Sequence, residues 1–156
     1  MKKWSTLLIL LALALFYFWR YRVTPGMSAN EISVITDAAH PINEIYSGPL
    51  LVNFYAAWCG ECLAEMDALE AASKKAPFKI IGVTDDNHER IAAIKQRFSI
   101  TFPLLKLEKS IKDYGIHSIP TTFLFNSDGE LVESWIGGQP WNDDAFLNNL
   151  ASELSK

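Results

Sequence analysis

The chain lacks a framework of cysteines. Only Cys59 and Cys62 occur among its 156 residues, so paired cysteines do not staple the fold as they do in small secreted domains. A structural zinc site is disfavoured too, because it usually takes four ligands and no second Cys-x-x-Cys is present. The three histidines, His40, His88 and His117, are isolated and lack the spacing of zinc ligands. We therefore expect neither a metal ion nor another cofactor.

The chain also lacks an excess of positive charge. It has 14 basic and 18 acidic residues, and four of the basic ones precede residue 23, so ten basic residues face all eighteen acidic ones in the remainder. An acidic domain has no electrostatic reason to bind nucleic acid or anionic lipid. We expect no nucleic-acid partner, and we interpret the acidity chiefly as a source of solubility.

Charge is absent altogether from the run Trp4–Trp19, which basic residues flank on both sides. This run is shorter than the roughly 20 residues of a usual spanning helix, but basic and aromatic flanks extend its reach. No small-x-small cleavage site follows it, which disfavours a cleaved signal peptide. A core helix is disfavoured by the terminal position and the lack of a polar face. We expect a signal anchor forming a transmembrane helix over 1–22, a linker over 23–30 and one domain over 31–156.

The orientation of this anchor follows from the flanking charges. Lys2, Lys3 and the α-amino group lie on one side, and Arg20 and Arg22 on the other. This slight bias favours an inside N-terminus. We expect a single-pass protein of the cell membrane with its domain on the extracytoplasmic, or periplasmic, side.

What the chain does contain is a Cys-x-x-Cys where a buried strand meets a helix. An apolar run over 50–57 precedes Cys59, and apolar residues recur at helical spacing after Cys62. The first sulfur then lies at a helix N-terminus, where unpaired amides favour the thiolate. The thiolate attacks disulfides and the second cysteine resolves the mixed disulfide. A purely structural disulfide closing so short a loop would constrain the unfolded chain little, so the motif indicates a redox site.

The rest of the chain alternates between strand and helix patterns. Strands are expected over 32–36, 78–84, 120–126 and 130–136, with a hairpin turn at 127–129, a helical turn within 41–48, and helices after 85–87 and from an N-cap at Asn142. Strands alternating with helices, closed by a hairpin and a helix, predict an α/β fold with a central mixed sheet covered by helices on both faces.

These residues carry a family resemblance. The segments LVNFYAAWCGEC over 51–62, Glu65-Met66 and YGIHSIPTTFL over 114–124 resemble the thioredoxin superfamily, specifically the membrane-anchored TlpA/ResA-like thiol-disulfide oxidoreductases. The likeness runs from about residue 32 to 150 and implies a thioredoxin-like fold. Asn53 replaces the Asp of cytoplasmic thioredoxins. Asp67 replaces a helix-kinking Pro of many relatives, which predicts a straighter helix.

The resemblance and the local chemistry together assign roles around the dithiol. Cys59 is expected to be the exposed nucleophile and Cys62 the less exposed resolving cysteine. Gly60 and Glu61 between them are expected to tune the redox potential, because a carboxylate beside the thiolate opposes its ionisation. Glu65 is expected to be a third catalytic residue, since the matching acid of the relatives tunes proton transfer at the dithiol.

A second segment is expected to bind the substrate. X-Pro bonds are rarely cis, but the resemblance implies that Ile119-Pro120 is cis. The backbone of Ile119 would then pair with an extended substrate beside Cys59. Trp58 is expected to cover the edge of the active site. His117 is expected in an exposed loop, without a catalytic role.

The sequence thus predicts an enzyme, a thiol-disulfide oxidoreductase acting as a reductase. The resemblance implies cysteine-containing protein substrates outside the cytoplasm, with cytochrome c maturation as one setting, and a membrane thiol carrier as electron donor. One alternative is a peroxiredoxin-like peroxidase, which needs a Pro-x₃-Thr-x₂-Cys arrangement that is missing here. The other is a non-catalytic thioredoxin-fold binding domain, which the retention of both cysteines and of Ile119-Pro120 disfavours.

Overall fold

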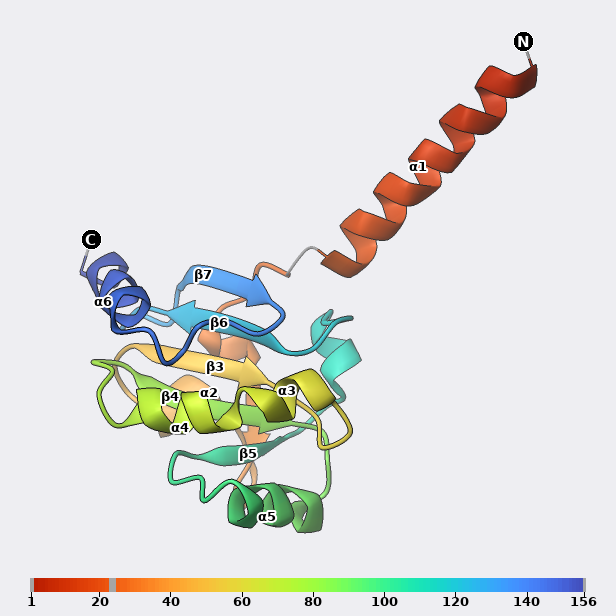
Figure 1. Cartoon of the computed structure of the whole chain (residues 1–156). Coiled ribbons are helices and arrows are strands. Elements are labelled where there is room, and N and C mark those ends of the chain that lie inside the picture. Colours follow the sequence, from red (N-terminus) through yellow and green to blue (C-terminus); the bar gives the residue numbers. More distant parts are fainter. Residues whose placement is uncertain (1, 23–24, 156) are drawn as a thin grey trace.

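A mixed sheet of seven strands forms the centre of the protein (Figure 1). The computed structural model describes residues 2–22 and 25–155. Within them the strands follow the order β2-β1-β5-β4-β3-β6-β7 across the sheet. Their bounds are β1 Ser33–Ile35, β2 Ala39–Pro41, β3 Leu50–Phe54, β4 Lys79–Thr84, β5 Leu104–Leu107, β6 Thr121–Phe125 and β7 Leu131–Ile136. Strand β4 runs parallel to β3 and β5, and the other neighbouring pairs are antiparallel.

Helices cover both faces of this sheet, which confirms the thioredoxin-like α/β architecture expected from the sequence. The helices of the described residues are α1 Lys2–Arg22, η1 Ala29–Glu31, α2 Ile42–Ile45, α3 Gly60–Ala64, α4 Met66–Ser73, α5 His88–Arg97, η2 Ile111–Tyr114 and α6 Asp144–Glu153, of which α1 does not cover the sheet. Apolar residues of α4, α5 and α6 share one buried cluster with the sheet. Residues of η1, α2 and η2 share the other cluster. Figure 1 shows α3 and α4 lying across the sheet beside β3 and β4.

The central strand β3 feeds both clusters because alternate side chains of a strand point to opposite faces. Leu51 and, just beyond the strand, Tyr55 belong to the cluster under α4 and α6. Leu50, Val52 and Phe54 belong to the cluster under α2. All five residues of β3 are buried. Asn53 therefore points to the same face as Leu51 and Tyr55, which brings an amide into an otherwise apolar layer.

Two short strands went unpredicted. Strand β2 has only three residues, ends in Pro41 and lies at an edge of the sheet, where a missing N–H is tolerated. Strand β5 has four residues and follows directly on Pro103. Its position depends on Gly82, where an added Cβ would lie 2.5 Å from Leu104 Cδ2. The close contact between Gly82 and Leu104 thus helps to set the register between β4 and β5, and no local sequence pattern predicts this contact.

The start of the last helix differs from the prediction by one residue. Asn142 was expected to be the N-cap, but Asp143 holds that position and its carboxylate accepts hydrogen bonds from the amides of Ala145 and Phe146. A charged carboxylate beside the positive end of a helix dipole is favoured over a neutral amide.

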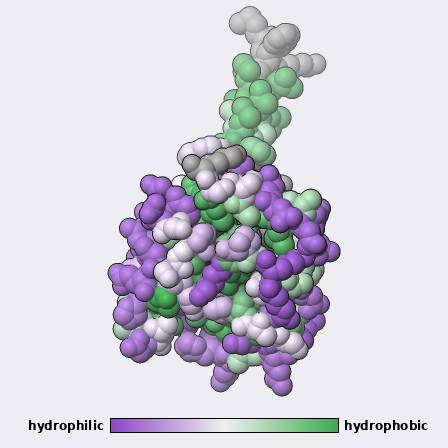
Figure 2. All heavy atoms as spheres, turned by 90° about the vertical axis from the view of Figure 1, so that its left-hand side faces the viewer, coloured by the Kyte–Doolittle hydropathy of each residue, from purple (hydrophilic) through white to green (hydrophobic). Residues whose placement is uncertain are grey.

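Helix α1 extends away from the globular domain (Figure 1), and Figure 2 shows its hydrophobic surface rising above a largely hydrophilic body. The prediction of a helix here is confirmed, but that of a transmembrane helix is not supported. Among the described residues, no helix is long and apolar enough to cross a membrane. The uncharged run Trp4–Trp19 would span about 24 Å at about 1.5 Å per residue, against a hydrocarbon core of about 30 Å.

Candidate functional site

Cys59 and Cys62 form a disulfide at the start of α3. Cys59 is the N-cap of this helix, and the backbone amide of Cys62 donates to its Sγ at 3.2 Å. Cys62 is completely buried, whereas 7 % of Cys59 is exposed. The order of accessibility is the expected one, but the expectation of an openly exposed Cys59 is wrong for the disulfide form. In this form its sulfur is bonded to Cys62.

The second predicted segment lies against this disulfide. The carbonyl oxygen of Ile119 is 3.8 Å from Cys59 Sγ, and the Ile119-Pro120 peptide bond is cis. The carbonyl of Pro120 accepts a hydrogen bond from the amide of Gly137 at 2.8 Å, which joins this segment to the end of β7. Trp58 is 75 % exposed beside the disulfide. The structure thus brings Trp58, Cys59, Ile119 and Pro120 together at one surface.

Two clefts open on either side of this surface. One has a volume of about 530 Å³ and the other about 310 Å³. Both are lined by Trp58 and the segment His117–Ile119. The larger cleft adds Glu61 and the end of β7, and the smaller adds η2 and Ile116. His117, for which no function was expected, therefore lines both clefts next to the disulfide.

Asp86, which the sequence analysis did not single out, holds the loop that leads to Trp58. Its carboxylate accepts from the amide of Ala57 at 2.7 Å and pairs with Arg90 at 3.1 Å. It also accepts from the hydroxyl of Thr84 at 3.1 Å. The available signal was its place two residues after the end of β4, since the carboxyl ends of the parallel strands β3 and β4 meet at the same edge of the sheet.

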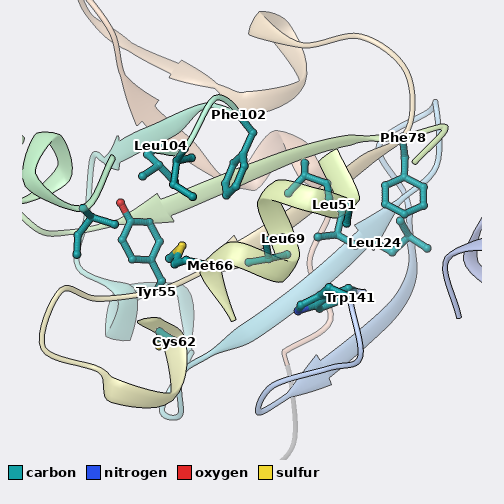
Figure 3. Close-up of a cluster of buried hydrophobic side chains, with 14 of the residues drawn as sticks. Leu51, Tyr55, Cys62, Met66, Leu69, Phe78, Phe102, Leu104, Leu124 and Trp141 are labelled. Carbon is teal, nitrogen blue, oxygen red and sulfur yellow. The ribbon is translucent and has the colours of Figure 1, made fainter. Parts of the chain in front are cut away.

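Glu65 lies buried behind the disulfide in a polar network. Its Oε1 accepts from Asn53 Nδ2 at 2.9 Å, and its Oε2 accepts from Trp141 Nε1 at 2.7 Å. Asn53 Nδ2 also donates to the hydroxyl of Thr122 at 2.9 Å. Figure 3 shows Cys62 and Trp141 within one buried cluster. Trp141 was missed by the sequence analysis, because nothing local links a residue 76 positions away to this glutamate.

The pKa of Glu65 is raised above its ordinary value. Burial is the main cause, because it disfavours the charged form. Hydrogen bonds from Trp141, Asn53 and the amide of Gln139 oppose this shift, and the charge of Glu61 adds to it. A buried, hydrogen-bonded carboxyl with a raised pKa, three residues after Cys62 in the chain, holds a proton more tightly than an exposed carboxylate does and is a candidate proton acceptor for the dithiol.

Glu61 is exposed and turns toward the end of β7. Its Oε1 accepts from the amide of Gly138 at 3.1 Å. Gly137 has a φ of +87°, and a Cβ there would lie 3.2 Å from the same oxygen. Glycine therefore suits this turn on both grounds. Gly60 and Glu61 lie between the two cysteines, and the hydrogen bond from Gly138 holds the Glu61 carboxylate in the larger cleft. Their tuning of the redox potential stays a prediction.

The helix after the cysteines is not straight, contrary to the expectation drawn from Asp67. It is divided into α3 and α4 at Glu65, which ends one helix and precedes the next. The amide of Glu65 bonds to the carbonyl of Leu63, while its own carbonyl accepts from Leu69 at 2.9 Å to start α4. The break allows the Glu65 side chain to reach Asn53 and Trp141. No proline is needed for this break.

The positions of the possible metal-ligating side chains were compared with the needs of a metal site. Among them, no three or more His, Cys, Asp or Glu side chains gather closely enough to hold a metal ion. The chemistry that these side chains offer is that of a dithiol with a buried carboxyl beside it.

Comparison with known proteins identifies the same chemistry. Residues 25–134 match the model of the AhpC/TSA family. The chain is 26 % identical over 155 residues to the thioredoxin-like protein YneN of Bacillus subtilis, covering 88 % of this chain and 91 % of YneN. It is 31 % identical over 129 residues to thioredoxin of Porphyra purpurea, covering 81 % and 96 %. It is 31 % identical over 96 residues to the thiol-disulfide oxidoreductase ResA of Bacillus thuringiensis, covering 58 % and 56 %.

Solved structures share the fold. A thiol:disulfide interchange protein DsbE from Chlorobium tepidum superposes with a TM-score of 0.66 at 16 % identity, covering 85 % of this chain and 99 % of that one. StoA from Bacillus subtilis gives 0.57 at 22 % identity, covering 83 % and 98 %. The predicted thioredoxin-like fold and the predicted enzyme class, a thiol-disulfide oxidoreductase, are confirmed by these relatives and structures taken together.

Proposed function

The chain belongs to the AhpC/TSA family of thioredoxin-like proteins, and we propose that its Cys59–Cys62 pair reduces disulfides of proteins outside the cytoplasm. The observation that carries this proposal is the geometry of the pair. A barely accessible Cys59 lies between two clefts, and its sulfur accepts a backbone hydrogen bond at 3.2 Å that would equally stabilise a thiolate. A completely buried partner, Cys62, is within bonding distance behind it.

The exchange runs in two displacements. The Cys59 thiolate of the reduced enzyme attacks one sulfur of the substrate disulfide, and the other substrate sulfur leaves as a thiolate. Cys62 then loses its proton and attacks Cys59 Sγ, which releases the second substrate sulfur as a thiolate. The protein ends as the Cys59–Cys62 disulfide, having passed two electrons to the substrate, and each released thiolate takes up a proton.

Glu65 is proposed to accept the proton of Cys62 in the second displacement. Burial holds its pKa above the ordinary value, so its proton affinity lies closer to that of a thiol than an exposed carboxylate's would. Asn53 and Trp141 fix both oxygens of the carboxyl group. They act as positioning residues for this proton transfer.

The peroxidase alternative finds no support at the site. A Pro-x₃-Thr-x₂-Cys arrangement would place proline and threonine at positions 52 and 56, which are Val52 and Ala56. Val52 lies within the buried strand β3, packed in the cluster on the face away from α4. Neither side chain offers a hydroxyl to a peroxide.

We expect a reducing potential. The Glu61 and Glu65 carboxyl groups both raise the cost of a thiolate nearby, and destabilising the reduced form lowers the potential. Equilibration of the full chain with glutathione should give a value nearer to the about −270 mV of thioredoxin than to the about −120 mV of DsbA. Glu61→Gln should raise it by about 20 mV, and Glu133→Gln, which removes an exposed charge from β7, should leave it unchanged. A wild-type value close to that of DsbA would contradict the direction proposed.

The partners of such a reductase follow from its chemistry. Substrates are cysteine-containing proteins in a compartment where disulfides persist, and apocytochrome c during cytochrome c maturation is the setting that we propose. A reductase there needs electrons, because nothing in an oxidising compartment regenerates its dithiol. A membrane thiol carrier is proposed as the donor.

We also propose that α1 holds the domain at the extracytoplasmic face of the cell membrane. Eleven large apolar or aromatic side chains between Leu7 and Trp19 are each at least 56 % exposed. Exposed apolar surface of this extent favours association with a membrane or a protein.

The location is tested in intact cells. The full chain should fractionate with membranes, keep an N-terminus that precedes Arg22, and have its reduced Cys59 alkylated by reagents that do not cross the membrane. A variant in which a cleavable signal peptide replaces residues 1–24 should be exported and appear in the soluble extracytoplasmic fraction. Recovery of the full chain in the soluble fraction, or protection of Cys59 from the impermeant reagent, would contradict this location.

A further inference from the structure

The larger of the two clefts beside Cys59 contains a carboxylate that takes part in neither of the two displacements. It is lined by Glu61, by Trp58, by His117–Ile119 and by the segment Ile136–Gly138. Ile119, whose carbonyl lies 3.8 Å from Cys59 Sγ, forms part of the same wall. A peptide extended along Ile119 with its cysteine at Cys59 would therefore place a neighbouring side chain in this cleft.

The Glu61 carboxylate is held in place for such a contact. The amide of Gly138 donates to its Oε1 at 3.1 Å, and the second carboxylate oxygen of this exposed residue can accept from a ligand. A carboxylate fixed by its surroundings loses less side-chain entropy on pairing with a ligand than a freely rotating one. Neither displacement of the exchange requires this orientation.

Glu61 is the one acidic side chain among the described residues that line this cleft, and His117 is the one basic side chain there. Among the described residues lining this cleft, none is a lysine or arginine. Lys112 lines the neighbouring cleft, where Asp85 accompanies it. Glu65 lies behind the cleft wall, close enough for its pKa to respond to the charge of Glu61. The electrostatic environment beside Cys59 thus complements a cation.

We propose that Glu61 is a specificity-determining residue, which selects substrate peptides that carry a basic side chain close to the cysteine being reduced. The proposal rests on the proposed thiol–disulfide exchange, because the peptide is brought to the cleft by the attack of Cys59. The lysine or arginine of the substrate pairs with Glu61 in the cleft, while the apolar wall formed by Trp58 and Ile119 covers its aliphatic part.

The test compares disulfide-linked homodimers of short peptides. Each peptide has one cysteine flanked by lysine, by glutamine or by glutamate, and the reduced full chain is mixed with each at low ionic strength. Each rate is divided by the rate at which dithiothreitol reduces the same peptide, which cancels the effect of the flanking charge on the disulfide itself. Glu133→Gln is the matched control, because it removes one exposed carboxylate outside the cleft.

The normalised rate should be about fivefold higher for the lysine peptide than for the glutamate peptide, with glutamine between them. Glu61→Gln should bring this ratio close to one, even if it changes all rates in common, and Glu133→Gln should retain it. A wild-type ratio near one, or a ratio that Glu61→Gln leaves intact, would overturn this proposal alone. Failure to reduce any peptide would overturn the proposed function and this proposal with it.

Discussion

Replacement of Cys62 by serine is expected to convert the protein into a trap for its substrates. Once Cys59 has attacked a substrate disulfide, only Cys62 is placed to release the mixed disulfide, because the two sulfurs are bonded in the oxidised form. Without a thiol at position 62 the covalent complex persists. Replacement of Cys59 should instead prevent the complex from forming, because the remaining Cys62 is completely buried.

The complexes are measured on non-reducing gels after cells expressing each variant are acidified and alkylated. Cys62→Ser should give a ladder of bands that disappears on reduction, and Cys59→Ser should give none. The two variants control for each other, since each removes one of the chain's two cysteines. The reverse pattern, with complexes on Cys62 alone, would contradict the assigned roles.

Glu65→Gln is expected to slow the second displacement by about 100-fold, the scale of a lost general base. Glutamine keeps the size of the side chain and can still accept from Trp141 or Asn53, so the change removes mainly the ability to take up a proton. Decay of a preformed mixed disulfide between Cys59 and glutathione, followed by rapid mixing, isolates this step. The first displacement should change far less, because Cys59 needs no proton acceptor once it is a thiolate.

Glu70→Gln provides the matched control. Glu70 is also a buried glutamate of the same helical region, but its carboxylate accepts from the amide and hydroxyl of Thr101, away from the disulfide. Its loss should cost stability without slowing the second displacement. Equal slowing by both variants would indicate a general effect of removing buried carboxyl groups and would contradict a role of Glu65 in proton transfer.

The same pair of variants separates two pH dependences of stability. Burial raises the pKa of Glu65 above its ordinary 4.5, so its contribution is complete below that value and is lost as the pH rises through the folded-state pKa. Burial acts likewise on Glu70, but hydrogen bonds from Thr101 and Lys74 outweigh it and lower that pKa. The contribution of Glu70 is therefore present above the ordinary pKa and lost as the pH falls. We expect denaturant unfolding at several pH values to show that Glu65→Gln removes the loss of stability with rising pH. The loss of stability with falling pH, which comes from Glu70, should remain in this variant.

Much of the fold could be predicted because its main elements have strong local patterns. Strand β3 is a continuous apolar run, and Asn87 caps α5 with a side chain that accepts from Arg90, as its position before an amphipathic run suggests. The elements that were missed depend on distant partners. Strand β5 has only four residues and takes its place through Gly82 and the parallel pairing with β4.

The residues of the site also differ in whether local sequence patterns predict them. Cys59, Cys62 and Pro120 are marked by motifs, and the structure brings them together. Trp141 and Asp86 belong to no motif, because the contact that links each of them to the site is a hydrogen bond to a residue far along the chain. The helix break at Glu65 was not predicted either. Nothing in the helical pattern shows that the Glu65 side chain will point inward and accept a hydrogen bond from the side-chain amide of Asn53 in β3.

The central claim, that this dithiol catalyses disulfide reduction, is tested most directly by the reduction of insulin. The full chain with dithiothreitol should precipitate the insulin B chain well before dithiothreitol alone does, and Cys59→Ser should fall to the rate of the uncatalysed reaction. A wild-type chain no faster than dithiothreitol alone, or a Cys59→Ser variant as fast as the wild type, would contradict the account.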